Sequence, residues 1–123
     1  MAFKFEKLVI WSRALEISDE IHLMTRVFPK EELFILTSQI KRAADSISLN
    51  IAEGSTGQST SEQLRFIRYA QRSALEVVNG LFLARNRTYI DGNVFKEKYQ
   101  RMEKFIIMIQ AFKRALVEKK SLY

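Results

Sequence analysis

The feature of this sequence that most constrains its fold is a repeated three-and-four spacing of apolar residues. Between residues 8 and 28, the row consists of Ile10, Ala14, Ile17, Ile21, Met24 and Phe28. Steps of three and four place side chains on one face of an α-helix. Period-two alternation, which marks a half-buried strand, is not sustained in any segment. We therefore predict amphipathic helices over residues 8–28, 31–53, 60–87 and 94–120.

The other three predicted helices each carry their own apolar row. In the second it is Leu33, Leu36, Ile40, Ala43, Ala44, Ile47 and Ile51. In the third it is Ile67, Ala70, Ala74, Val77, Leu81 and Ala84. In the fourth it is Phe95, Met102, Phe105, Ile109, Phe112 and Leu116. Further large apolar residues lie at the flanks or outside the rows: Trp11, Leu15, Phe34, Ile35, Leu49, Phe66 and Ile107. Because these exceed what one bundle core needs, they favour self-association of the chain.

Proline and glycine mark where the predicted helices end. Pro29 disfavours helical geometry in the residue before it, so it ends the first helix. Gly54 fits the position just past the second helix, where a left-handed conformation costs glycine nothing. Glu31 and Glu32 are expected to be first-turn acids that favour the helix dipole. Short connections make sequential helices antiparallel neighbours, so residues 1–123 should form one all-α, up-down-up-down four-helix bundle.

Two further signals mark helix starts. Ser59 and Glu62 have the spacing of a capping box, in which the serine hydroxyl accepts from the Glu62 amide while the carboxylate reaches back. Asp91 and Asn93 precede the fourth helix, and either side chain can cap it.

The composition is poor in the residues that carry catalysis or bind metals. The chain has no cysteine and one histidine, His22, so thiolate and histidine-cluster metal sites cannot be assembled. No nucleophile–base pair is recognisable, and we predict no catalytic residue, no metal, no cofactor and no enzymatic activity. The N-terminal residues lack the cationic leader and apolar core of a signal peptide, and the apolar runs are too short to cross a membrane, so we expect a cytoplasmic protein.

The positive charge of the chain is unevenly distributed. The net charge is +6, yet residues 1–58 hold 7 Lys and Arg against 8 Asp and Glu. Residues 59–123 hold 13 against 6, so the whole basic excess lies in the second half. Such an asymmetry is typical of a chain with a polyanionic partner, most commonly nucleic acid, although a solvated basic surface that aids solubility gives the same pattern.

Basic side chains are concentrated on one face of the third helix. Arginine suits phosphate because its planar guanidinium donates two parallel hydrogen bonds, and a neighbouring tyrosine can stack on a base. A merely solvated face remains the alternative. The candidate RNA contacts on this helix are Arg65, Arg68, Tyr69 and Arg72. Two further candidates, Arg101 and Lys104, lie on the fourth predicted helix.

A row of polar residues follows the apolar row of the second helix. It consists of Gln39, Arg42, Ser46, Asn50 and Glu53, and faces Ser73 and Glu76 on a flank of the third helix. Half-buried polar groups need partners, so these residues predict a hydrogen-bonded network that fixes helix register or partner choice. A ligand site is the alternative.

Several stretches of the sequence together resemble one protein family. They are residues 5–11, Phe28-Pro29, residues 39–44, Ser46-Ile47, Asn50-Ile51-Ala52-Glu53-Gly54 and residues 65–70, followed by Ser73 and Glu76. The chain is similar, over about residues 5–90, to the four-helix bundle proteins encoded in intervening sequences of bacterial 23S ribosomal RNA genes (S23-like). It departs from their pattern at Ser38 and at Gln71-Arg72.

This resemblance implies a bacterial four-helix bundle that assembles as a ring-like homo-oligomer, a pentamer. It carries no established activity, and the link to ribosomal RNA comes mainly from gene location. The leading hypothesis is a non-enzymatic homo-oligomer that binds RNA or a ribonucleoprotein through basic helix faces. The alternative is a protein-interaction scaffold with no nucleic-acid role.

Overall fold

The structure, a computed structural model, describes residues 2–57 and 59–121 of the chain. Its four long helices are α1 (Val9–Met24), α2 (Leu36–Gly54), α3 (Thr60–Asn86) and α4 (Gly92–Ser121). Short 3-10 turns occupy Lys4–Lys7, Thr25–Val27 and Lys30–Glu32, and the described residues contain no strand. The predicted all-α class is confirmed.

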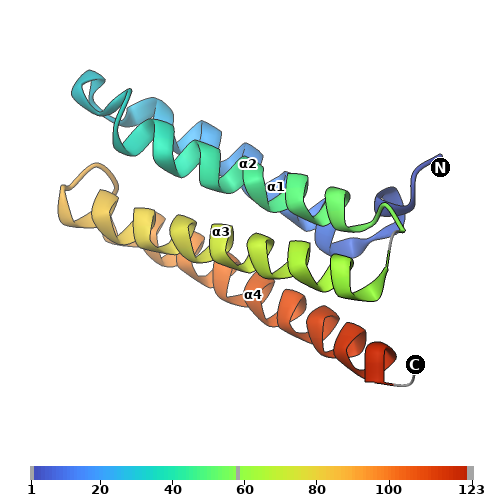
Figure 1. The fold of residues 1–123 in the computed structure, drawn as a ribbon. Helices are drawn as coiled ribbons and strands as arrows, with labels where there is room; N and C mark the ends of the chain where they lie inside the picture. The colour runs from blue at the N-terminus through green and yellow to red at the C-terminus, as the bar shows by residue number, and fades with distance from the viewer. Residues whose placement is uncertain (1, 58, 122–123) are drawn as a thin grey trace.

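The four helices run up and down in sequence order. In Figure 1 the α1–α2 and α3–α4 connections lie at one end of the bundle, while the α2–α3 connection lies at the other end with both termini. The most extensive contact is between α2 and α3, and the least extensive among sequential or closing pairs is between α1 and α4. This arrangement is the predicted up-down-up-down four-helix bundle.

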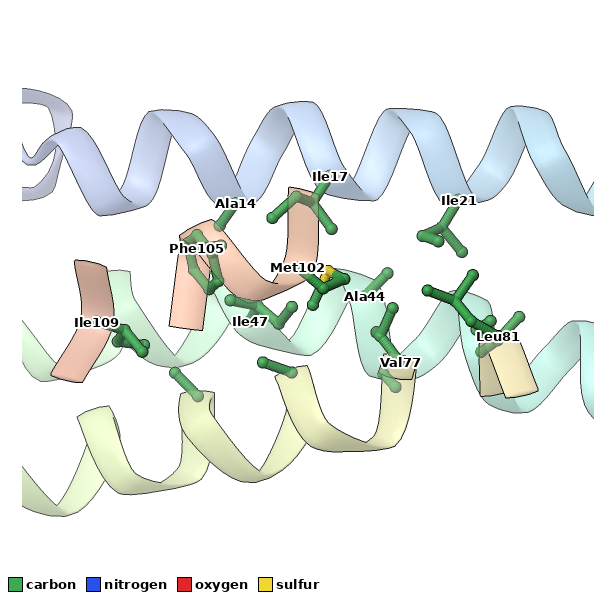
Figure 2. Close-up of a cluster of buried hydrophobic side chains, with 14 of the residues drawn as sticks. Ala14, Ile17, Ile21, Ala44, Ile47, Val77, Leu81, Met102, Phe105 and Ile109 are labelled. Carbon is green, nitrogen blue, oxygen red and sulfur yellow. The ribbon is translucent and has the colours of Figure 1, made fainter. Parts of the chain in front are cut away.

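The apolar rows of all four helices meet in one core. Figure 2 shows Ile17 of α1, Ile47 of α2, Leu81 of α3 and Ile109 of α4 pointing into the same interior. Ile47, Leu81 and Ile109 have no exposed surface, so each contributes the full burial of an aliphatic side chain, worth about 1.5–3 kcal/mol. In the described part of the chain, none of the helices has both the length and the apolar character needed to cross a bilayer.

The α2/α3 interface is close because small residues line it. A Cβ atom added to Gly80 would lie 2.7 Å from Cδ1 of Ile40, which is itself buried. One added to Gly54 would lie 3.0 Å from Cβ of Phe66. Gly54 was expected just past the helix, but it is the last residue of α2, and no left-handed conformation explains it. Because Gly54 has no side chain, it leaves space for α3 to approach α2.

The start of α2 differs most from the sequence-based expectation. The helix begins at Leu36 rather than residue 31, because a 3-10 turn over Lys30–Glu32 and a turn through Ile35 (φ −120°, ψ −100°) come first. Leu33 therefore leaves the predicted apolar row and is 50% exposed. Glu32 is not a first-turn acid: it is buried, and its carboxylate accepts a 3.4 Å hydrogen bond from the Leu36 amide at the helix start.

The capping predictions for the later helices hold in part. Ser59 Oγ accepts from the Glu62 amide at 3.1 Å, but the Glu62 carboxylate binds the Arg65 guanidinium instead of reaching back to Ser59. Of the two candidates before α4, Asp91 is the cap, since its Oδ1 accepts from the Val94 amide at 2.8 Å. The helix itself begins two residues earlier than predicted, at Gly92.

Candidate nucleic-acid interface

The arginines of α3 form an exposed row on the side of the helix away from the core. Arg65, Arg68 and Arg72 are all exposed, as their spacing of three and four predicts. Arg65 is partly neutralised by its bond to Glu62. Among the described residues, Arg68 and Arg72 have no carboxylate within 4.0 Å. Their charge is therefore available to an external anion.

Tyr69 lies within this row and is 38% exposed. The Arg72 guanidinium carbon lies 6.0 Å from the centre of the Tyr69 ring, at the outer limit of a cation–π contact. The Phe66 ring meets the Tyr69 ring edge-on, with 5.7 Å between the ring centroids. An aromatic ring between cationic groups is the kind of surface on which an unpaired base can stack.

Three members of the predicted polar row form one hydrogen-bonded group, in which the Ser46–Ser73 contact crosses the α2/α3 interface. Ser46 Oγ and Ser73 Oγ lie 2.7 Å apart, so one hydroxyl donates to the other. Asn50 Nδ2 donates to the Ser46 carbonyl at 2.8 Å and to the Ser46 hydroxyl at 3.2 Å. The serine pair joins α2 to α3 at Ser73, the residue that follows Arg72.

The remaining members of the polar row do not join this group. Arg42 lies on the α1 side of α2, next to Asp45 and Leu49, while Glu53 lies near Arg65 at the α2–α3 connection. Gln39 and Glu76 instead line a groove of about 470 Å³ between α2 and α3. This α2/α3 groove is lined by residues that include Gln39, Ile40, Arg72, Glu76, Asn79 and Gly80.

The predicted polar row and the predicted arginine row meet at this groove. Arg72 belongs to the arginine row and also lines the groove, so the polar row and the basic face share one surface. In the described chain, the side chains of Gln39, Glu76 and Asn79 make no intramolecular hydrogen bond. Of these three side chains, Asn79 was not among the site residues predicted from the sequence.

The two candidate contacts from α4 lie elsewhere. Arg101 Nη2 lies 3.1 Å from a carboxylate oxygen of Glu20 and 3.8 Å from one of Glu16, both on α1. Lys104 lines a separate hollow between α1 and α4, together with Arg13. The six candidate contacts therefore divide into an α3 group, in which Arg68 and Arg72 are unpaired among the described residues, and an α4 group, in which Arg101 is already paired.

A second polar cluster joins α1 to α2. Asp45 Oδ1 accepts from the Ser18 hydroxyl and lies 2.9 Å from His22 Nε2. Ser-His catalysis requires the imidazole to lie between the hydroxyl and the carboxylate, whereas here the carboxylate lies between the other two groups. The sequence alone does not show that Asp45 lies near His22, because the two residues come from different helices. The cluster therefore links α1 to α2 and has a structural role.

A third cluster connects the two loops at one end of the bundle. Glu32 Oε2 accepts from the Tyr89 hydroxyl at 2.7 Å and from Arg87 Nη1 at 3.0 Å. The Tyr89 hydrogen bond is the main reason why the pKa of Glu32 is lowered, with the Leu36 amide and Arg87 adding to the effect against burial. The same bond, with burial, raises the pKa of Tyr89. This cluster fixes the turn that precedes α2.

Within residues 2–57 and 59–121, no three His, Asp or Glu side chains are grouped so that they could hold a metal ion.

Comparisons with known proteins agree with this architecture. The structure of a protein of unknown function from the S23 ribosomal protein family of Bacteroides thetaiotaomicron VPI-5482 superposes with a TM-score of 0.78. The two sequences are 21% identical, and the match covers 86% of this chain and 96% of the other, which shows a shared fold. A comparison with curated proteins gives no match.

The family model described as 23S rRNA-intervening sequence protein matches residues 6–111. With four helices in the expected order and a family match over most of its length, the chain belongs to the 23S rRNA-intervening sequence protein family.

Proposed function

We propose that this protein is a non-enzymatic RNA-binding module of the cytoplasm, and that it contacts RNA through the arginine row of α3. The observation that carries the proposal is the exposure of Arg68 and Arg72 without any carboxylate in reach among the described residues. An unpaired guanidinium on a rigid helix can bind phosphate without first losing an internal partner.

The α4 candidates contribute less under this proposal. Arg101 must give up its contacts with Glu16 and Glu20 before it can bind a phosphate. That exchange returns little free energy, because one ion pair replaces another. Arg68, Tyr69 and Arg72 form the centre of the proposed interface, and Arg65 lies at its edge.

The test is a pair of double substitutions that remove equal charge from different faces. R68Q/R72Q removes two cations from the α3 row, and K96Q/R114Q removes two from exposed positions of α4 that are outside the candidate set. Binding to a stem–loop RNA is measured by fluorescence anisotropy between about 50 and 200 mM salt. We expect R68Q/R72Q to weaken binding and to lower the log–log salt slope by roughly 1.4–1.8, the value for two lost phosphate contacts.

The control variant should change affinity slightly and leave most of the slope intact, since long-range charge is screened at these salt concentrations. Equal effects of the two variants would show that binding follows net charge alone and would remove the α3 row as an interface. Circular dichroism must show unchanged helicity for both proteins.

We also propose that the chain assembles with copies of itself. The segment Leu33-Phe34-Ile35 supports this, because its three side chains are 50%, 89% and 59% exposed at one end of the bundle. Leu49 is 67% exposed and lines the same surface hollow as Leu33 and Phe34. Contiguous apolar surface of this kind marks an interaction site, and a pentamer is the assembly that the family resemblance implies.

Sedimentation or light scattering on the wild type and on Phe34→Asp tests the assembly. We expect an oligomer for the wild type and a smaller species for the variant, because a desolvated carboxylate opposes association. The exposed Phe34 can be replaced without loss of core packing, so a folded variant that keeps the wild-type mass would exclude this segment from the interface.

The same exposed segment favours the alternative function, a protein-interaction scaffold. In that case, the wild type is a monomer and R68Q/R72Q affects RNA binding no more than K96Q/R114Q does, while a partner protein is retained by the wild type and lost from Phe34→Asp.

A further inference from the structure

The α2/α3 groove has the size and the chemistry of a site for one small planar group. Its volume of about 470 Å³ lies within the range of ligand-binding pockets. Gln39 lines it from α2, and Glu76 and Asn79 line it from α3. Glu76 and Asn79 are three residues apart, so their side chains are neighbours on one helix face.

The position of Arg72 links this groove to the arginine row. Arg72 lines the groove and also lies against Tyr69. A phosphate held at Arg68 and Arg72 would place the attached nucleotide beside the groove. Glu76 repels a phosphate, so the part of the nucleotide that enters the groove must be one that donates hydrogen bonds.

Building on the proposed RNA-binding function, we propose that the groove receives one unpaired guanine base. A carboxylate only accepts hydrogen bonds, and the Watson–Crick edge of guanine offers two adjacent donors, the N1–H and the N2 amine. The Asn79 or Gln39 amide can donate to guanine O6. Adenine presents an acceptor at N1 and uracil one donor between two carbonyls, so both fit a carboxylate less well.

This arrangement restricts the RNA that can bind. A base inside a duplex has its Watson–Crick edge occupied, so the groove reads only a loop, a bulge or a single strand. The phosphate contacts of the arginine row are independent of sequence, and the groove supplies the discrimination.

The experiment uses the full chain and three single-stranded RNAs. They are an oligouridine, the same strand with one central guanosine, and the same strand with inosine, which lacks the N2 amine. The variant is E76Q, and the matched control is E103Q, which removes the same charge from an exposed position on α4. Neither Glu76 nor Glu103 has a cation within 4.0 Å among the described residues, so both variants should fold.

We expect the wild type to bind the guanosine strand about tenfold more tightly than oligouridine, with inosine in between, as one good bidentate contact allows. E76Q should weaken binding of the guanosine strand and strengthen binding of oligouridine, because it removes an acceptor and a negative charge together. E103Q should preserve the ratio of the two affinities.

Equal wild-type affinity for the three strands would overturn the guanine proposal, as would identical effects of E76Q and E103Q. If R68Q/R72Q still weakens binding to all strands, the proposed function stands without a base-reading groove. If the wild type binds none of the strands and no stem–loop RNA, both proposals fall.

Discussion

The α2/α3 and α1/α4 interfaces of this bundle are held in different ways. Between α2 and α3, Gly54 and Gly80 bring the backbones close, and short Ser46 and Ser73 side chains bond directly. Between α1 and α4 the contact is less extensive, and long charged side chains bridge it. Arg101 reaches Glu20 and Glu16, and Lys98 lies 3.8 Å from Glu20.

The difference explains which charges remain available for a ligand. The close α2/α3 interface is formed by small and short side chains, and the arginine row of α3 is exposed. The less extensive α1/α4 interface is bridged by oppositely charged side chains that form ion pairs with each other. The basic residues of the second half therefore include Arg68 and Arg72 on α3, which are unpaired among the described residues, and Arg101 on α4, which is paired with α1.

Substitution of Gly80 should give the largest effect and tests the close interface directly. In Gly80→Leu, the new side chain starts 2.7 Å from Ile40, so α2 and α3 must separate. Overpacking of this kind costs about 3 kcal/mol of unfolding free energy. Gly92→Leu is the matched control: nothing lies within 4 Å of its added Cβ, and we expect a change within about 0.5 kcal/mol. Urea unfolding measures both, and equal losses would show that space at Gly80 does not matter.

An intermediate effect is expected at the end of the bundle, where Glu32 joins both connections. The pKa of Glu32 is lowered from 4.5 in the folded chain, so its carboxylate stabilises the fold fully above that pH. This contribution is lost as pH falls below 4.5 and through the folded pKa. Glu32→Gln should therefore be less stable than the wild type at pH 6, and the gap should narrow in acid. A gap that is constant from pH 6 to about pH 3 would contradict a charged role for Glu32.

The smallest effect should come from the bridged interface. Arg101 and Glu20 are partly exposed, at 46% and 26% of their side chains. Exposed pairs of this kind couple by about 0.2–1 kcal/mol, and salt weakens them. A double-mutant cycle with Arg101→Gln and Glu20→Gln measures this coupling. A value well above 1 kcal/mol would mean that α1 and α4 depend on charge as strongly as α2 and α3 depend on close packing.

Much of the core could be predicted from local spacing. The apolar rows of α1 and α3 are buried throughout, from Ile10 to Met24 and from Ile67 to Ala84, and Phe28 is buried beyond the end of α1. The error at Leu33 arose because a periodic pattern continued through residues whose backbone is not helical. The first helix was predicted to run to residue 28 before Pro29, but α1 ends at Met24 and a 3-10 turn over Thr25–Val27 follows it. No sequence signal sets how many residues the chain needs before the next helix begins.

The candidate site was predictable only in pieces. The spacing of Arg65, Arg68 and Arg72 gave a shared helix face. The sequence does not show that Arg72 shares a groove with Gln39, or that Arg101 pairs with Glu20. Both depend on the position of each helix along its neighbour.

By itself, the sequence determined four helices, their buried faces and the basic second half, because helical periodicity is a local property that repeats every 3.6 residues. The tertiary structure alone decided which polar side chains meet. Ser18 and His22 meet Asp45, and Glu32 meets Tyr89, across separations of 23 to 57 residues. Those pairs depend on how the helices and their connections are placed against one another, which is set by packing between residues distant in the chain.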